Sequence, residues 1–481
     1  MDPAIARAPP HRPRQEHAGL PAHAARRQPV TELRDILRHG GAVLVGQLAV
    51  TAYGVVDTVI AGRHSNEALA ALSVGSAVFI SVFVALMGVL QALLPVWAEL
   101  HGAGRQAEVG RSLRQALYLC AITIVIGMAA LLHPDPLLRL TGVPEAMQEE
   151  VRGYLRVLAW TVPAALLFRM YATLNQSLGK PLLVTWLQIG SLAVKVPLSI
   201  WFAFGGLGLP ASGAVGCAWA SLVVNYLMLF TAFWLLRTEP FYRPYGLWRP
   251  MERPHGPTLA RYARLGVPGG LAILVEVTSF TLMALFIARL GTVASAAHQV
   301  AANVAAVLYM VPLSLGIATS ARVGYWLGAG DPHRARRVLV TGFKVTLGAA
   351  VVLASLLLLS RHGLANLYAA NTQVAALAGA LLAWVAIYHV ADATQALSVF
   401  VLRCYRVAIA PLMVYCVLLW GVGLGGGYLL AYEGIAGRPP LQAPQAFWMT
   451  GGAALSLTAI IFVLLVRHRS APGRNGATAT N

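Results

Sequence analysis

The sequence predicts an all-α polytopic membrane protein whose twelve transmembrane helices form two pseudo-symmetric bundles of six. Three observations predict this fold class: the composition, the spacing of long apolar segments, and a repeat of motifs between the two halves. Of the 481 residues, 58% are hydrophobic and only 11% are charged. An ordinary soluble protein carries roughly a quarter of its residues as charged side chains. The composition therefore excludes a soluble enzyme.

The helices are placed by apolar length and by the Gly, Pro and charged residues between them. Each needs roughly 20 apolar residues to cross a hydrocarbon core of about 30 Å. The first six are expected at 36–61, 72–98, 115–132, 155–178, 182–204 and 212–236. The second six are expected at 262–288, 296–325, 338–360, 375–402, 410–431 and 446–466.

The remaining segments divide the chain into five parts. Residues 1–32 are rich in Pro, Arg, His and Ala and contain no apolar run, so we expect a disordered tail. The two bundles are expected at 33–236 and 259–467, and a proline-rich linker at 237–258 joins them. Residues 468–481 form a second tail.

The net charge of +18 is explained by membrane topology. If the N-terminus is cytoplasmic, the cytoplasmic segments hold 26 of the 36 Lys and Arg residues and the outside segments hold seven. This asymmetry is the positive-inside pattern of membrane proteins. We therefore expect the linker and both termini in the cytoplasm, and no nucleic-acid partner.

The two halves repeat motifs in the same helical order. A shift of 226 residues superposes Arg63 on Arg289 and the Gly-Ala-Gly sequence 102–104 on 328–330. Because six crossings separate the halves, both enter the membrane in the same direction, and the repeat axis lies along the membrane normal. Two such lobes facing a central cleft are a common plan for a transporter.

Three acidic residues fall inside expected helices: Asp57, Glu276 and Asp392. An ionisable group in hydrocarbon is unfavourable unless it is neutralised, paired or hydrated, so each is a candidate functional residue. Tyr388 precedes Asp392 by four residues, which places the phenol and the carboxylate on one helix face. Such a face can hold a proton or bind Na⁺ through oxygen atoms, and the sequence leaves both open.

Two basic residues, Arg169 and Lys195, also fall inside expected helices. Their own helices contain no acid, so Asp57 is the expected counter-charge in the N-terminal half if the helices meet. The alternatives are that Arg169 faces a hydrated cavity and that the Lys195 side chain reaches toward an interface.

Six motifs in this order and spacing resemble the multidrug and toxic compound extrusion (MATE) transporters, and within them the NorM-like branch. They are VDTVIAG (56–62), HGAGR (101–105), VEVTSF (275–280), AAHQVAANV (296–304), RVGYWLGAGD (322–331) and IYHVADATQ (387–395). The resemblance covers essentially the whole chain after the first tail. It implies two six-helix bundles in a V that export cationic and amphipathic drugs in exchange for Na⁺ or H⁺.

The resemblance also implies functional residues. It assigns coupling-ion roles to Asp57, Glu276 and Asp392, the same acids that burial selects, with Tyr388 as the aromatic residue one turn before the last. Na⁺, if it is the coupling ion, is expected at Glu276 and Asp392, and no other metal is expected.

The sequence departs from the NorM-like branch in the fifth helix. Residues 194–200 read VKVPLSI where an Asn-rich LNIPLN-like segment is usual, so that Lys195 and Ser199 stand at positions that are normally polar but uncharged. Lys195 acting as a built-in cation of the N-terminal half would leave cation exchange to Glu276 and Asp392.

The expected function is secondary active export of drugs and organic cations by a monomer in the bacterial inner membrane. It has membrane lipids around it and no cofactor other than the coupling ion. Four apolar or aromatic residues are expected in the substrate cleft, although they equally suit helix packing: Phe280, Met283, Tyr309 and Met310. The alternative is a flippase for a lipid-linked substrate, with Arg169 and Lys195 binding its pyrophosphate. A membrane scaffold is disfavoured because it has no use for three buried acids.

Overall fold

A computed structural model shows the chain as a bundle of long α-helices. It describes residues 29–135, 145–206, 208, 210–369, 371–434, 437 and 439–471, and none of these forms a strand. Within this part of the chain, twelve helices are long and apolar enough to cross a membrane, which confirms the predicted number. Residues 1–28 and 472–481, where most of the two expected tails fall, lie outside the described residues.

The N-terminal half contains seven described helices. They are α1 (Pro29–His64), α2 (Asn66–Gln91), α3 (Leu94–Gly102), α4 (Gln106–Leu132), α6 (Glu145–Ser177), α7 (Pro181–Phe204) and α8 (Gly213–Thr238). Helices α2 and α3 make one crossing that is interrupted just before Pro95, which cannot donate a backbone hydrogen bond. Most helices extend past the predicted apolar segments because polar residues continue or cap them. Ser65 Oγ, for example, accepts from the Ala68 amide at 3.0 Å where α2 begins.

The C-terminal half follows the short 3₁₀ segment η2 (Pro240–Tyr245) of the linker. Its helices are α9 (Gly256–Ala288), α10 (Thr292–Gly328), α11 (Pro332–Tyr368), α12 (Thr372–Cys404), α13 (Ile409–Tyr415), α14 (Gly426–Tyr428) and α15 (Gln445–Arg469). Two π-helical segments, η3 (Cys416–Gly425) and η4 (Leu429–Glu433), join α13 and α14 into one crossing. Helix α1 begins at Pro29 and α15 ends at Arg469, so each of these helices extends into a segment that was expected to be a tail.

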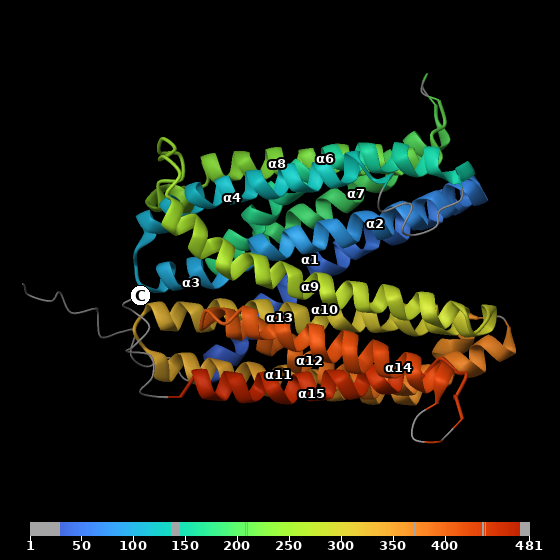
Figure 1. The fold of residues 1–481 in the computed structure, drawn as a ribbon. Helices are drawn as coiled ribbons and strands as arrows, with labels where there is room; N and C mark the ends of the chain where they lie inside the picture. The colour runs from blue at the N-terminus through green and yellow to red at the C-terminus, as the bar shows by residue number, and fades with distance from the viewer. Residues whose placement is uncertain are drawn as a thin grey trace, which may run out of the picture.

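The two halves pack with the same internal pattern (Figure 1). Helix α6 contacts α2, α4 and α8, and its counterpart α12 contacts α10, α11 and α15. Between the halves, α1 packs on α10 and α9 packs on α2. Because α9 and α10 are the counterparts of α1 and α2, a two-fold axis exchanges these two contacts. The packing therefore confirms the two pseudo-symmetric six-helix bundles.

The halves meet closely at the end of the molecule where the linker lies, which we call the linker end. Gly102 at the end of α3 and Gly328 at the end of α10 are the symmetric glycines of the repeat. A Cβ at Gly102 would lie 1.9 Å from the Tyr325 carbonyl oxygen, and one at Gly328 would lie 1.9 Å from the Glu99 carbonyl oxygen. Only glycine fits at either position. Figure 1 shows the halves together at this end and apart at the other.

Ion pairs join the halves at the same end. Arg322 of α10 pairs with Glu32 and with Asp35 of α1, the latter at 3.0 Å. Arg406, which follows α12, pairs with Glu99 of α3. Opposite charges on the two halves therefore add to the close helix packing at the linker end.

The linker is anchored to α4 by buried polar groups. The Arg114 guanidinium donates to the Glu252 carboxylate at 2.9 Å and 2.5 Å and to the Gly246 carbonyl oxygen at 2.6 Å. Gln115 Oε1 accepts from the His255 amide at 2.9 Å. The hydrogen bonds from Arg114 lower the pKa of Glu252 to about 2. The linker is thus held in one position against the N-terminal half.

Glu252→Gln is expected to loosen the linker. The substitution removes the negative partner of Arg114. A partly exposed ion pair of this kind contributes roughly 1 kcal/mol to holding the linker against α4, so its loss should raise the population of molecules with a detached linker about fivefold. Limited proteolysis in the linker should become faster by that factor. Since the pKa of Glu252 is lowered from 4.5 to about 2, the wild-type linker should be fully protected above pH 4.5 and lose protection as the pH falls toward 2.

Glu239→Gln is the matched control for the linker. Glu239 is an exposed linker acid that forms no ion pair with any described residue. Equal acceleration of cleavage by both variants would show that the Arg114–Glu252 pair does not hold the linker.

Candidate functional site

One side-chain amide bridges two of the predicted acids in the C-terminal half. Glu276 lies on α9 and Asp392 on α12, and Gln395 Nε2 donates to Glu276 Oε1 at 3.3 Å and to Asp392 Oδ1 at 2.9 Å. The Tyr415 hydroxyl donates to the side-chain amide oxygen Oε1 of Gln395. Asp392 is 3% exposed and Gln395 is fully buried. We call these four residues the carboxyl cluster.

The carboxyl cluster contains no cation of its own. Among the described residues, no basic side chain forms an ion pair with Glu276 or Asp392. The buried Arg403 lies three turns further along α12 and interacts with Glu276 only at longer range. Two ionised carboxylates repel each other in an interior of low dielectric, so the cluster favours a bound proton or cation.

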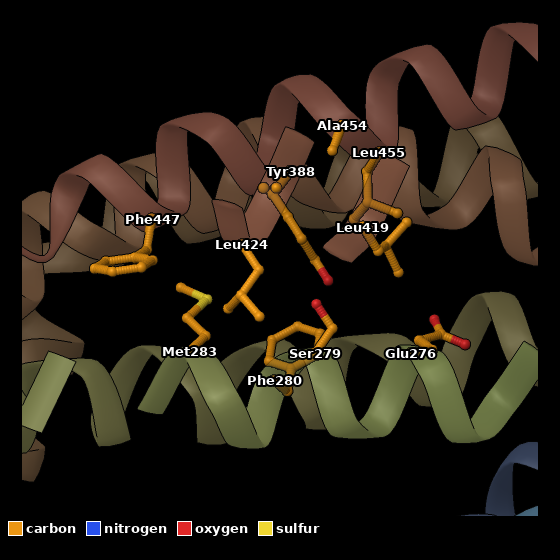
Figure 2. A pocket seen from close by; sticks show the side chains of 12 residues that line it. Glu276, Ser279, Phe280, Met283, Tyr388, Leu419, Leu424, Phe447, Ala454 and Leu455 are labelled. Atoms are coloured by element: carbon orange, nitrogen blue, oxygen red, sulfur yellow. The ribbon is translucent and has the colours of Figure 1, made fainter. Parts of the chain in front are cut away.

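A small pocket lies beside Glu276, between α9 and the helices across from it (Figure 2). Its polar lining residues are Glu276, Ser279 and Tyr388, and its volume is about 40 Å³. A water molecule needs roughly 10–15 Å³ by this measure, whereas drug-sized ligands occupy pockets of about 300–1,000 Å³. The pocket therefore has room for a few waters or a hydrated ion, and not for a drug.

Tyr388 faces this pocket and not Asp392. The two residues lie one turn apart on α12 as expected, but no hydrogen bond joins them among the described residues. The Tyr388 ring packs edge-on against Phe280 and Trp448, with centroid distances of 6.0 Å and 5.7 Å. This packing directs the hydroxyl across the pocket toward Ser279 (Figure 2).

The predicted substrate-cleft residues do not form one surface. Phe280 and Met283 line the small pocket inside the C-terminal bundle. Tyr309 and Met310 are not among its lining residues. Met310 instead faces the other half, where its Sδ lies 3.9 Å from the Thr51 hydroxyl of α1.

Gln395 and Tyr415 were not among the residues that the sequence indicated. Gln395 could have been found, since it ends the IYHVADATQ motif and lies three residues after Asp392, on the same helix face. Tyr415 gave no such signal, because it reaches the cluster from a different helix.

The structure brings Asp57 and Lys195 together in the N-terminal half. Lys195 Nζ on α7 lies 2.8 Å from Asp57 Oδ1 on α1. It also donates to Ser221 Oγ at 2.8 Å, to Ser199 Oγ at 3.3 Å and to the Cys217 carbonyl oxygen at 3.4 Å. Lys195 is 0% exposed and Asp57 is 7% exposed. The lysine side chain therefore does not reach toward an interface.

Arg169 stands apart from both groups. It lies half-buried on α6 and forms no ion pair with Asp57 or with any other described residue. Asp57 thus meets one of the two cations for which it was the expected counter-charge.

Comparison with known proteins identifies the family. The family model for MatE matches residues 42–201 and 268–429, which are more than half of the chain. A probable multidrug resistance protein NorM of Aromatoleum aromaticum is 36% identical over 432 residues, which cover 90% of this chain and 93% of that protein. The multidrug resistance protein MdtK of Pectobacterium atrosepticum is 33% identical over 444 residues, covering 92% and 96%.

Solved structures share the fold. The eukaryotic MATE transporter AtDTX14 superposes with a TM-score of 0.81 at 18% identity, covering 92% of this chain and 98% of that chain. The Vibrio cholerae MATE transporter VcmN in the bent form gives a TM-score of 0.80 at 17% identity, with the same coverage. The solved structures show that the fold is shared, and the matched family model and the sequence relatives show that the chain belongs to the MatE family.

Proposed function

We propose that this protein is a secondary active multidrug exporter that exchanges cationic or amphipathic drugs for Na⁺ or H⁺ at the carboxyl cluster. The observation that carries the proposal is a pair of carboxyl groups inside the membrane-spanning helices, the half-buried Glu276 and the buried Asp392, which Gln395 bridges and which form no ion pair with any described residue. A site that needs a proton or cation for charge balance, in a membrane protein of two rocking lobes, suits ion-driven transport. The names of the relatives, multidrug resistance proteins, support drugs as the substrate class.

The position of Glu276 supports coupling between the ion and the two halves. Glu276 lies on α9, the helix of the C-terminal half that packs on α2 of the N-terminal half. A change in the charge of Glu276 therefore acts on a helix that joins the halves. Exchange requires that binding of the ion disfavours binding of the drug, and a drug site between the halves meets this requirement. The pocket beside Glu276 is too small to hold a drug, which supports a drug site between the two halves.

The proposed orientation places the linker and both termini in the cytoplasm of a bacterial cell. The distribution of Lys and Arg supports it, since 26 of the 36 fall in the segments assigned to the cytoplasm and seven fall in those assigned to the outside. In this orientation the halves meet on the cytoplasmic side, and the drug leaves toward the outside.

The structure removes Lys195 as support for the flippase alternative, which rested on Lys195 and Arg169. Lys195 is fully buried and its charge is matched by Asp57, so it is not available to a pyrophosphate. Arg169 alone is a weak basis for a site that must bind a doubly charged group.

The test is efflux of a fluorescent cationic dye from proteoliposomes under an imposed Na⁺ gradient or an imposed pH gradient. Dye movement should follow one of the two gradients in the wild type and should be lost in Asp392→Asn. Glu67→Gln, which changes an exposed acid at the start of α2, is the control and should transport normally. Folded protein that moves no dye under either gradient would contradict antiport and favour the flippase.

A further inference from the structure

The Lys195 ammonium group sits in a cage of oxygen atoms. The cage is built from the Asp57 carboxylate, the Ser199 and Ser221 hydroxyls and the Cys217 carbonyl oxygen, all within 2.8–3.4 Å of Nζ. Carboxylate, hydroxyl and carbonyl oxygens are the ligands that hard metal cations prefer. The atoms come from α1, α7 and α8, so the cage joins three helices of the N-terminal half. The cation at its centre is the ammonium group of Lys195, a side chain of the protein itself.

The cage is electrically balanced without any outside ion. The carboxylate of Asp57 matches the charge of Lys195. In the part of the chain that the structure describes, the other titratable side chains that interact with Asp57 are Tyr154 of α6 and Cys217 of α8. The ring of Tyr53 on α1 lies 5.7 Å from Nζ and adds a cation–π contact. Both titratable neighbours are neutral at physiological pH, so they do not compete for the ammonium group.

The negative charge of the acids inside the membrane is therefore balanced differently in the two halves. In the C-terminal half the carboxyl cluster has a neutral amide between its acids, and no described basic residue pairs with it. In the N-terminal half the ammonium group is fully buried and covalently attached to α7, so it cannot diffuse away as Na⁺ or H⁺ can. Separating a buried pair leaves two uncompensated charges, which is strongly unfavourable.

We infer that Lys195 is a tethered cation that permanently fills a cation site at Asp57, so that ion exchange is confined to the carboxyl cluster. That ions are exchanged at the carboxyl cluster rests on the proposed function. That Lys195 fills the cage does not depend on it. Lysine thereby determines how many acids of this chain take part in coupling. Removing its charge should turn the cage into a second site for a proton or a monovalent cation.

Infrared difference spectroscopy of the full-length protein tests the inference at equilibrium, without transport. A protonated carboxyl group has a carbonyl stretch that an ionised carboxylate lacks. In the wild type, carboxyl bands that respond to pH or to added Na⁺ should disappear in Glu276→Gln and Asp392→Asn. They should be unchanged in the double variant Asp57→Asn/Lys195→Met, which replaces the ion pair by neutral groups of similar size and is expected to fold.

The single variant Lys195→Met supplies the positive result. In Na⁺-free buffer it should gain one protonated-carboxyl band, and that band should be absent from the double variant. Loss of a responsive wild-type band in the double variant would show that Asp57 exchanges ions in spite of Lys195, and would overturn the inference. Absence of a new band in folded Lys195→Met would overturn it as well. Failure of dye transport in the wild type would contradict the proposed function, whereas the spectra decide the occupancy of the cage independently of transport.

Discussion

Gly102→Ala is expected to drive the two halves apart at the linker end. The new methyl group would lie 1.9 Å from the Tyr325 carbonyl oxygen, a backbone atom that moves only if α3 and α10 separate. Overpacking of this kind costs about 1–3 kcal/mol, which shifts an equilibrium between two lobe arrangements by roughly 5- to 150-fold. Spin labels at the exposed positions Gln106 and His333, one on each half, should show a longer distance in the variant.

The symmetric variant and an unhindered glycine make this prediction specific. Gly328→Ala should lengthen the same distance, because its methyl group would lie 1.9 Å from the Glu99 carbonyl oxygen. Gly348→Ala on α11 is the control, since nothing lies within 4 Å of a Cβ there. An unchanged distance in both Gly102→Ala and Gly328→Ala would show that these contacts do not set the arrangement of the halves.

The same glycines show what sequence could and could not predict about the fold. Apolar length gave the twelve crossings, and the 226-residue shift matched the sequences around Gly102 and Gly328. A repeat shows that two segments are equivalent, but it does not show that they touch. Their contact depends on how the bundles face each other, which is a property of the assembled helices. Helix ends were also missed, because polar residues such as Ser65 and Asp331 cap helices that begin outside the predicted hydrocarbon segments.

For the candidate site, the sequence was most informative where a buried charge has few possible partners of opposite sign. Asp57 was the one intramembrane acid predicted in the N-terminal half, so its meeting with Lys195 could be foreseen. The substrate-cleft residues were chosen by side-chain type, and type does not fix the direction in which a side chain points. Met310 therefore faces α1 while Met283 lies in the C-terminal bundle. The position of Tyr415 against Gln395 depends on the packing of α13 on its neighbours, which no local pattern encodes.

Gln395→Leu is expected to make the coupling ion bind more tightly and leave more slowly. The Gln395 amide donates to both carboxyl groups, and these hydrogen bonds are strongest when the carboxylates are ionised, which is their state after the ion leaves. Leucine has a similar size and no donor, so the released state loses about 1.5–3 kcal/mol in total, mainly from the 2.9 Å bond to Asp392. Gradient-driven dye efflux should slow by roughly 10- to 100-fold, and half-saturation should occur at a lower concentration of the coupling ion.

Two further variants separate this electrostatic effect from a packing defect. Ser398→Ala changes another fully buried polar residue of α12 whose hydroxyl donates only to the Thr394 carbonyl oxygen of its own helix, so transport should stay near the wild-type rate. Tyr415→Phe removes the donor to the side-chain oxygen Oε1 of Gln395 and leaves the side-chain amide in place, so its effect should lie between those of the other two variants. Weaker ion binding in Gln395→Leu, or equal slowing by Ser398→Ala, would show that the amide does not stabilise the released state. The direction of the affinity change is decisive, because a collapsed or misfolded site can slow transport but cannot hold the ion more tightly.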